Sequence, residues 1–359
     1  MTSKQRCLAT IRGQPADRTP VFPLLMFLAA DRLGVSYRQF ATDGRALAEA
    51  QIQAYRRFGV DAITACSDAF RISADLGGDM RYPEASTPHL ARPLVVTTED
   101  VAGLRPVDPT RTGSRMADRV EAVHAMVRTV GAECLVLGWV DMPFAEACAV
   151  CGVQQFLVML VDEPALAHRL LAFLTGIVIA FAQAQVAAGA PMIGAGDAAA
   201  SLVSAAMYRE FALPYEQQVC QAVHDAGGLV KLHICGDTRA LLRDLVTSGA
   251  DLFNVDHLVP LEQAAAVFGG AEKAFKGNLD PVADLLRSDL ATVRTRAANA
   301  LMVGRGHRYL LSAGCEVPAG VSDEVFAAFC RQPQESDARA GADPDGLSLR
   351  GRTSRGWRG

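Results

Sequence analysis

The residues of this chain best suited to chemistry are one histidine and two cysteines that follow short apolar runs. His233 and Cys235 lie in the segment VKLHICGDT, and Cys315 lies much later, in YLLSAGCEVP. Side chains two apart on a strand point to the same side, so the first imidazole and thiol can approach one ion. One imidazole and two thiolates are three of the four ligands of a tetrahedral zinc ion. A site with three protein ligands and a variable fourth is of the catalytic kind.

Each of these residues also has an ordinary structural explanation. A free cysteine is usually a small buried hydrophobe, and a lone histidine is usually a satisfied core or surface residue. The chain has nine cysteines, and Cys148 and Cys151 form a CxxC pair. We interpret that pair as small buried residues of a helix, because no second CxxC accompanies it. A metal site at His233, Cys235 and Cys315 is favoured by the strand-end position that these three residues share.

Short apolar runs alternate with helical segments along the chain. We predict eight strands, at residues 20–27, 60–66, 134–140, 191–195, 229–234, 252–255, 274–277 and 309–312. This pattern over 359 residues predicts an α/β fold, a single (β/α)8 barrel of the TIM type. An open doubly wound sheet would need a glycine-rich loop after its first strand, and PVFPLLMF is followed by none.

The pattern also predicts the outline of the domain. We expect a helical extension over 1–12, an irregular insertion over 71–109 after the second strand, and a barrel domain covering 1–329. Residues 330–359 are poor in apolar residues, and we predict a disordered tail there. The carboxyl ends of barrel strands converge on one mouth, where active sites lie. Besides the histidine and the cysteines, the predicted strand ends carry Asp68, Asp141, Asp197, Asp256, Asn278 and Asp280.

Composition excludes several classes of partner. The net charge is −4, with 50% hydrophobic and 21% charged residues, which is ordinary for a globular protein. This charge provides no electrostatic footprint for nucleic acid or an anionic membrane. The first twenty residues lack the apolar core of a secretory signal, and polar residues interrupt the apolar stretch 170–190, which we interpret as a buried helix. We therefore expect a cytoplasmic protein with reduced cysteines.

Four segments resemble the uroporphyrinogen decarboxylase superfamily, in the expected order: LHICGDT, GADLFNVD, KGNLDPVADLL and LSAGCEVP. The resemblance extends from Arg6 to about Phe329 and implies a (β/α)8 barrel. One branch of the superfamily decarboxylates tetrapyrroles without a metal and has the motif Arg-Gln-Ala-Gly-Arg after the first strand. The equivalent stretch here, PLLMFLAAD, has no arginine before Arg32. A substrate with many carboxylates would lack its charge partners, which disfavours decarboxylation.

The other branch comprises cobamide-dependent methyltransferases, such as methylcobalamin:coenzyme M methyltransferase, which hold zinc through His-x-Cys and a cysteine near the last strand. His233, Cys235 and Cys315 match that pattern, and Asp256 is at the position of a displaceable fourth ligand, a glutamate in other members. The resemblance implies methyl transfer from methylcobalamin to a small thiol, whose pKa zinc lowers. The chain has no Asp-x-His-x-x-Gly corrinoid motif, so we expect the methyl-corrinoid from a separate corrinoid protein or as free cofactor.

The resemblance also suggests roles for other strand-end residues. We expect Asp197 and Asn278 to position the thiol or the corrin, with hydrogen bonding to the metal ligands as the alternative. We expect Trp139 and Asp141 to face the corrin macrocycle, although aromatic residues at such positions are more often core. Two other functions stay open: a decarboxylase, and a non-catalytic protein that binds a corrinoid or tetrapyrrole. A homodimer also stays open.

Overall fold

The main sheet has seven parallel strands that curl into a barrel. The computed structural model describes residues 1–342 of the chain. The strands follow one another in the sheet in chain order: β1 (Ala62–Thr64), β4 (Leu135–Asp141), β5 (Met192–Gly196), β6 (Leu229–His233), β7 (Leu252–Asn254), β8 (Ala274–Leu279) and β9 (Tyr309–Ala313). The α/β barrel predicted from the sequence is confirmed.

The segment predicted as a first strand, 20–27, forms two isolated bridges to the last strand instead of a strand of its own. Val21 pairs with Leu311, and Leu24 pairs with Glu316. The missing N–H groups of the two prolines in PVFPLLMF prevent a continuous ladder. On the other side, the Asp61 N–H at the start of β1 donates to the Val21 carbonyl over 2.7 Å. This segment therefore lies between β9 and β1 and closes the barrel.

A buried carboxylate holds that closing segment in place. Asp61 is 0% exposed and accepts hydrogen bonds from Arg6, from Arg18 and from the Val21 N–H, each over 2.7 Å at its shortest. Two arginines and one backbone amide thus neutralise and hydrogen-bond a fully buried charge, which is the condition under which burying it is tolerable.

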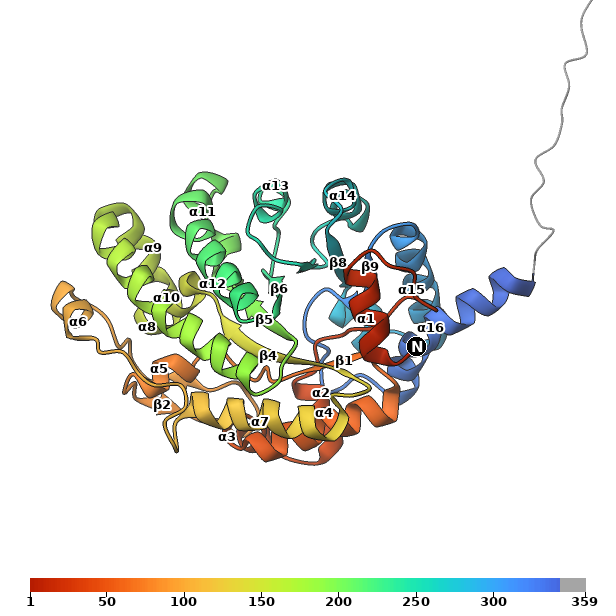
Figure 1. Cartoon of the computed structure of the whole chain (residues 1–359), viewed down its shortest axis with the longest axis horizontal. Coiled ribbons are helices and arrows are strands. Elements are labelled where there is room, and N and C mark those ends of the chain that lie inside the picture. The colour runs from red at the N-terminus through yellow and green to blue at the C-terminus, as the bar shows by residue number, and fades with distance from the viewer. Residues whose placement is uncertain (343–359) are drawn as a thin grey trace, which may run out of the picture.

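Helices lie around the outside of the sheet, as Figure 1 shows. The longer ones are α1 (Ser3–Ile11), α4 (Gly44–Phe58), α7 (Arg115–Val130), α8 (Pro143–Cys151), α9 (Val153–Asp162), α10 (Pro164–Ala187), α12 (Leu213–Asp225), α15 (Leu290–Gly304) and α16 (Asp323–Ala342). The shorter ones are α2 (Phe27–Leu33), α3 (Tyr37–Thr42), α5 (Arg71–Asp75), α6 (Thr98–Gly103), α11 (Ala205–Phe211), α13 (Leu242–Leu245), α14 (Leu261–Ala264), η1 (Ala198–Leu202), η2 (Ala265–Gly269) and η3 (Pro281–Leu286).

The predicted extension and insertion are both present. Helix α1 begins at a capping box made by Thr2 and Gln5, because their side chains satisfy each other's backbone amides. It packs against β1, β4 and β9. The insertion after β1 contains α5, α6 and a small antiparallel pair, β2 (Met80–Arg81) and β3 (His89–Leu90).

The predicted disordered tail is wrong for residues 330–342, which belong to α16. Phe326, Phe329 and Cys330 are buried on this helix, and α16 packs against α15 and α4. Burial of this apolar face stabilises α16, including its second half, whose residues are mostly polar. The rest of the predicted tail, 343–359, lies outside the described residues.

Helix α10 is long and apolar enough, by length and composition, to cross a membrane, and it is the single helix of that kind among the described residues. Half of its most apolar window is buried, and it packs against α8, α12 and β4. The predicted buried helix at 170–190 corresponds to this element.

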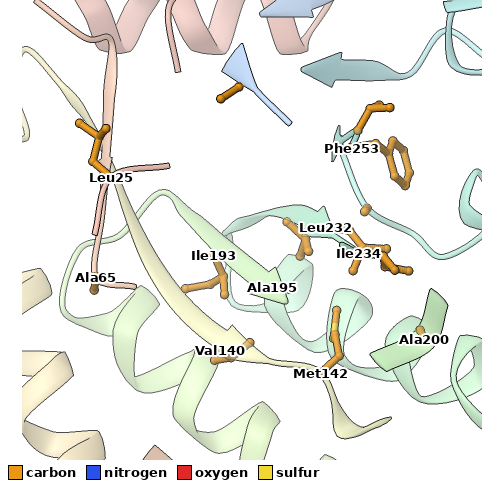
Figure 2. Close-up of a cluster of buried hydrophobic side chains, with 14 of the residues drawn as sticks. Leu25, Ala65, Val140, Met142, Ile193, Ala195, Ala200, Leu232, Ile234 and Phe253 are labelled. Atoms are coloured by element: carbon orange, nitrogen blue, oxygen red, sulfur yellow. The ribbon is translucent and has the colours of Figure 1, made fainter. Parts of the chain in front are cut away.

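The two faces of the strands bury different kinds of side chain. The face turned toward the helices is apolar, as Figure 2 shows for Val140, Ile193, Leu232 and Phe253. Alternate residues point into the barrel. At the amino ends of the strands, the side chains that point into the barrel form an apolar layer. It includes Phe22, Ala62, Leu137, Met192, Leu252, Ala274 and Leu310. Polar side chains begin one layer higher, toward the mouth.

Candidate metal centre at the barrel mouth

The ends of β6 and β9 bring one imidazole and two sulfurs together. His233 ends β6, Cys235 follows it by two residues, and Cys315 follows β9 by two residues. The Cys235 sulfur lies 3.1 Å from His233 Nε2 and 3.7 Å from the Cys315 sulfur. All three donor atoms lie within 4.8 Å of one another. His233 is buried, and the two cysteines are partly exposed toward the mouth.

The spacing of these atoms fits a tetrahedral zinc ion. Zinc–sulfur bonds of about 2.3 Å and tetrahedral angles place two sulfurs about 3.8 Å apart, close to the 3.7 Å between Cys235 and Cys315. A sulfur and a nitrogen ligand would be about 3.6 Å apart, somewhat more than the 3.1 Å found here. The two sulfurs are too far apart for a disulfide, whose bond is about 2.05 Å. The donor set therefore suits zinc with one free position.

The backbone around the cluster orients its ligands. His233 Nδ1 lies 3.3 Å from the Asn254 carbonyl, an arrangement that leaves Nε2 facing the sulfurs. The Asn254 side chain donates to the Gly314 carbonyl over 2.8 Å, next to Cys315. Gly236 has a φ of +91°, so the chain turns just after Cys235 in a conformation that favours glycine. These contacts tie the ends of β6, β7 and β9 into one unit.

The pKa values of the Cys235 and Cys315 thiols are shifted in opposite directions. The hydrogen bond between them lowers the pKa of the Cys315 thiol and raises the pKa of the Cys235 thiol. His233 also favours the Cys315 thiolate, while burial opposes it. A dication bound between the two sulfurs would favour the ionised form of both thiols.

Asp256, predicted as the fourth ligand, lies beside the cluster. Among the described residues the metal-competent group has three members, and Asp256 is not one of them. Its carboxylate accepts the Gly236 N–H over 2.9 Å and the Leu258 N–H over 3.0 Å, and lies 3.0 Å from His257 Nδ1. In this conformation Asp256 supports the turn that carries Cys235, and its role as a ligand stays a prediction.

The two residues predicted to position a substrate occupy different environments. Asn278 is partly exposed and donates to the carbonyls of Asp256 and Val259, over 3.3 and 2.5 Å. It also lines a 430 Å³ cavity together with His257. Asn278 therefore holds the loop that carries Asp256.

Asp197, the residue after β5, is instead buried next to α12. It is 0% exposed, and its N–H donates to the His233 carbonyl over 2.8 Å. Its carboxylate faces Glu216 of α12, and burial together with Glu216 raises its pKa. Since water does not reach this carboxyl group, Asp197 touches the cluster through its backbone and has no access to a substrate in this conformation.

Trp139 and Asp141, predicted to face a macrocycle, are nearly buried. Trp139 is 4% exposed and lies along β5, where a Cβ at Gly194 would be only 2.4 Å from its ring. Asp141 pairs with Arg71 over 2.5 Å, and burial, opposed by Arg71, raises the pKa of Asp141 to about 6. Trp139 thus fills the interior of the barrel, and its contact with a macrocycle stays a prediction.

Sequence reasoning missed two buried lysines below the cluster. Lys231 of β6 is 1% exposed and lies 4.5 Å from the centre of the Trp139 ring. Lys276 of β8 is 0% exposed and donates to the Phe22 carbonyl and to Ser312. Their spacing in the sequence could have revealed them. Lys231 lies two residues before His233 and Lys276 two residues before Asn278, so each lysine points to the same side of its strand as that residue.

A barrel with a polar cluster at the carboxyl ends of its strands defines an enzyme-like (β/α)8 domain. Comparison with known families identifies it further: residues 2–335 match the family model described as Uroporphyrinogen decarboxylase (URO-D). The chain belongs to this family.

The chain is similar to several curated relatives and to a solved structure. A uroporphyrinogen decarboxylase of Xanthomonas campestris pv. campestris is 31% identical, covering 81% of this chain and 86% of its own. One of Nocardioides sp. is 28% identical, covering 89% and 93%. A methyltransferase from Methanosarcina mazei has a TM-score of 0.85 at 22% identity, covering 94% and 99%. At that identity the structural similarity shows the fold alone.

Proposed function

We propose that this protein is a zinc-dependent methyltransferase that moves a methyl group from a methyl-corrinoid to a small thiol. The observation that carries the proposal is the convergence of His233, Cys235 and Cys315 within 4.8 Å at the mouth. A purely structural zinc site usually has four protein ligands, whereas three ligands leave a position for a substrate. The proposal includes a cytoplasmic location, where the cysteines would be reduced and free to bind a metal.

In this proposal His233, Cys235 and Cys315 hold the zinc ion. Zinc, when bound, lowers the pKa of a coordinated thiol so that the thiol reacts as a thiolate at neutral pH. The protein's own residues prepare the site: Asn254 fixes the imidazole and the Cys315 turn, and Asp256 fixes the Cys235 turn. The partial exposure of both cysteines lets a substrate reach the free position.

The proposed reaction balances without a further reactant. The thiol loses its proton to solvent, its sulfur forms a bond to the methyl carbon, and the electron pair of the broken cobalt–carbon bond stays on cobalt. The methyl-corrinoid would come from a separate corrinoid protein or as free methylcobalamin.

The test combines metal analysis with a spectrophotometric assay. Purified wild-type protein should contain about one zinc ion per chain, and Cys235→Ala and Cys315→Ala should lose it. Cys148→Ala is the matched control, because Cys148 is buried in α8 away from the cluster. The wild type should consume methylcobalamin with at least one thiol of a panel, and the two zinc-free variants should not. A zinc-free wild type, or a zinc-containing one inert toward every thiol and donor, would refute the proposal.

Decarboxylation of uroporphyrinogen is the second candidate, favoured by relatives of that name at about 30% identity. The arginines near the mouth argue against it. Arg71 is paired with Asp141, and Arg115 is paired with Asp68 over 2.8 Å, so neither is free for a substrate carboxylate. Incubation with uroporphyrinogen and chromatography of the oxidised porphyrins distinguishes the two, since the decarboxylase would act unchanged after treatment with a metal chelator.

A further inference from the structure

The ammonium group of Lys231 lies in the barrel layer directly below the metal centre. Lys231, His233 and Cys235 alternate along one face of the β6 segment, so all three point into the barrel. Lys231 is 1% exposed, and its ammonium group lies over the Trp139 ring. Burial lowers the pKa of Lys231 to about 8, and the neighbouring sulfurs of Cys66, Cys315 and Cys235 oppose that shift.

Packing alone does not explain a lysine at this position. Among the described residues Lys231 Nζ makes no hydrogen bond, and it lies over the face of the Trp139 ring at 4.5 Å from the ring centre. Lys276, in contrast, donates to the Phe22 carbonyl over 2.6 Å and to Ser312 over 3.0 Å. Placing a charged side chain that is only 1% exposed in this layer costs desolvation free energy that an apolar side chain of similar length would not cost. The position therefore carries a charge at the expense of stability.

The net charge of the metal centre determines how the Lys231 ammonium group would affect ligand binding. A divalent ion with two thiolates and one neutral imidazole has no net charge, so by itself it does not attract an anion. A positive charge one layer below makes the free position favourable for a ligand that adds a negative charge. It does not favour the metal ion itself, since two positive charges repel.

We infer that Lys231 is a positioning residue whose charge makes the metal centre prefer an anionic fourth ligand over a neutral one. The inference rests on the metal site of the proposed function and deepens it: the thiol substrate would be bound in its ionised form. Lys231 acts through the field it creates at the free position, and its contact with Trp139 holds the ammonium group there.

The test measures ligand binding to the full-length protein loaded with Co²⁺, whose visible spectrum reports its ligands. Thiocyanate is the anionic probe and imidazole is the neutral one. The variants are Lys231→Met, Lys231→Gln and Lys231→Arg, and urea unfolding verifies that each is folded. Lys273→Met is the matched control, because Lys273 bonds to the Ala250 carbonyl at the opposite end of the barrel.

Removing the charge should weaken thiocyanate binding by about tenfold or more, as expected for a charge interaction in a partly buried site. Affinity for imidazole and for Co²⁺ should stay within about twofold. Lys231→Arg should keep most of the thiocyanate affinity, and Lys273→Met all of it. The Gln variant provides a second neutral side chain should the Met variant fail to fold.

Two different results would overturn the inference. If both ligands weaken equally, or if Co²⁺ affinity falls in parallel, Lys231 has a structural role and its charge does not select the ligand. If the wild type binds no Co²⁺ at all, the proposed metal site fails, and this inference fails with it. The first result leaves the proposed function intact, so the two failures are distinguishable.

Discussion

Replacing Asn254 by alanine should weaken zinc binding without removing any ligand. Two contacts of this residue orient the cluster: its carbonyl faces His233 Nδ1, and its side chain donates to the Gly314 carbonyl beside Cys315. Alanine keeps the first contact and removes the second. The Cys315 turn is then free to shift, while the orientation of the imidazole is retained.

The magnitude follows from those two contacts. Loss of a residue that orients metal ligands typically costs 10- to 100-fold in metal affinity. Because only one of two contacts is lost, we expect about tenfold, or about 1.4 kcal/mol. The buried Gly314 carbonyl also loses its donor, which should lower the free energy of unfolding by about 1–3 kcal/mol.

Zinc affinity should be measured by competition with a chromophoric chelator, and stability by urea unfolding of the zinc-free protein. Asn299→Ala is the matched control, because Asn299 is exposed on α15. An Asn254→Ala protein that loses stability but binds zinc as tightly as the wild type would refute the reasoning. In that case the Cys315 turn would be held by other contacts.

Three further predictions concern the folded barrel. Asp61→Asn removes a fully buried carboxylate that pairs with Arg6 and with the partly exposed Arg18, and should lower the free energy of unfolding by about 3–5 kcal/mol, measured by urea unfolding. Gly194→Ala places a Cβ 2.4 Å from the Trp139 ring and should cost about 1–3 kcal/mol, whereas Gly176→Ala, with open space around it, should be neutral or stabilising in thermal unfolding. Burial raises the pKa of Glu216 to about 7, so the folded state keeps a proton that the unfolded state releases; wild-type stability should fall from pH 5 to pH 8 relative to Glu216→Gln, by up to about 3 kcal/mol.

Exposed residues provide the controls for these variants. Asp79→Asn removes an exposed partner of Arg81 and should change stability by at most about 0.5 kcal/mol. Glu262→Gln, at an exposed position, should leave the pH dependence of the wild type unchanged. A small effect of Asp61→Asn would show that Asp17, which also pairs with Arg6, and the solvent around Arg18 are sufficient partners for the two arginines. A Glu216→Gln protein with the wild-type pH slope would show that Glu216 is already ionised when folded.

The barrel and the three-residue cluster were predictable because both depend on local periodicity. Apolar runs of strand length, alternating with helices, indicate the fold. The spacing of His233 and Cys235 places both on one face, and the strand-end position of Cys315 directs it to the same mouth. These features follow from nearest neighbours in the chain and from the rule that parallel strands end on one side.

The remaining features depend on packing between segments far apart in the sequence. The depth of Asp197 is set by α12, which brings Glu216 against it, and the position of Trp139 is set by the glycines of β5. The link from Asn254 to Gly314 joins two strands 60 residues apart. Residues 330–342 are helical because α15 and α4 cover the apolar face of α16, although the residues themselves are mostly polar. The sequence by itself determined which residues could meet at the mouth; the tertiary structure decided which side chains face it, because burial depends on what packs against each strand.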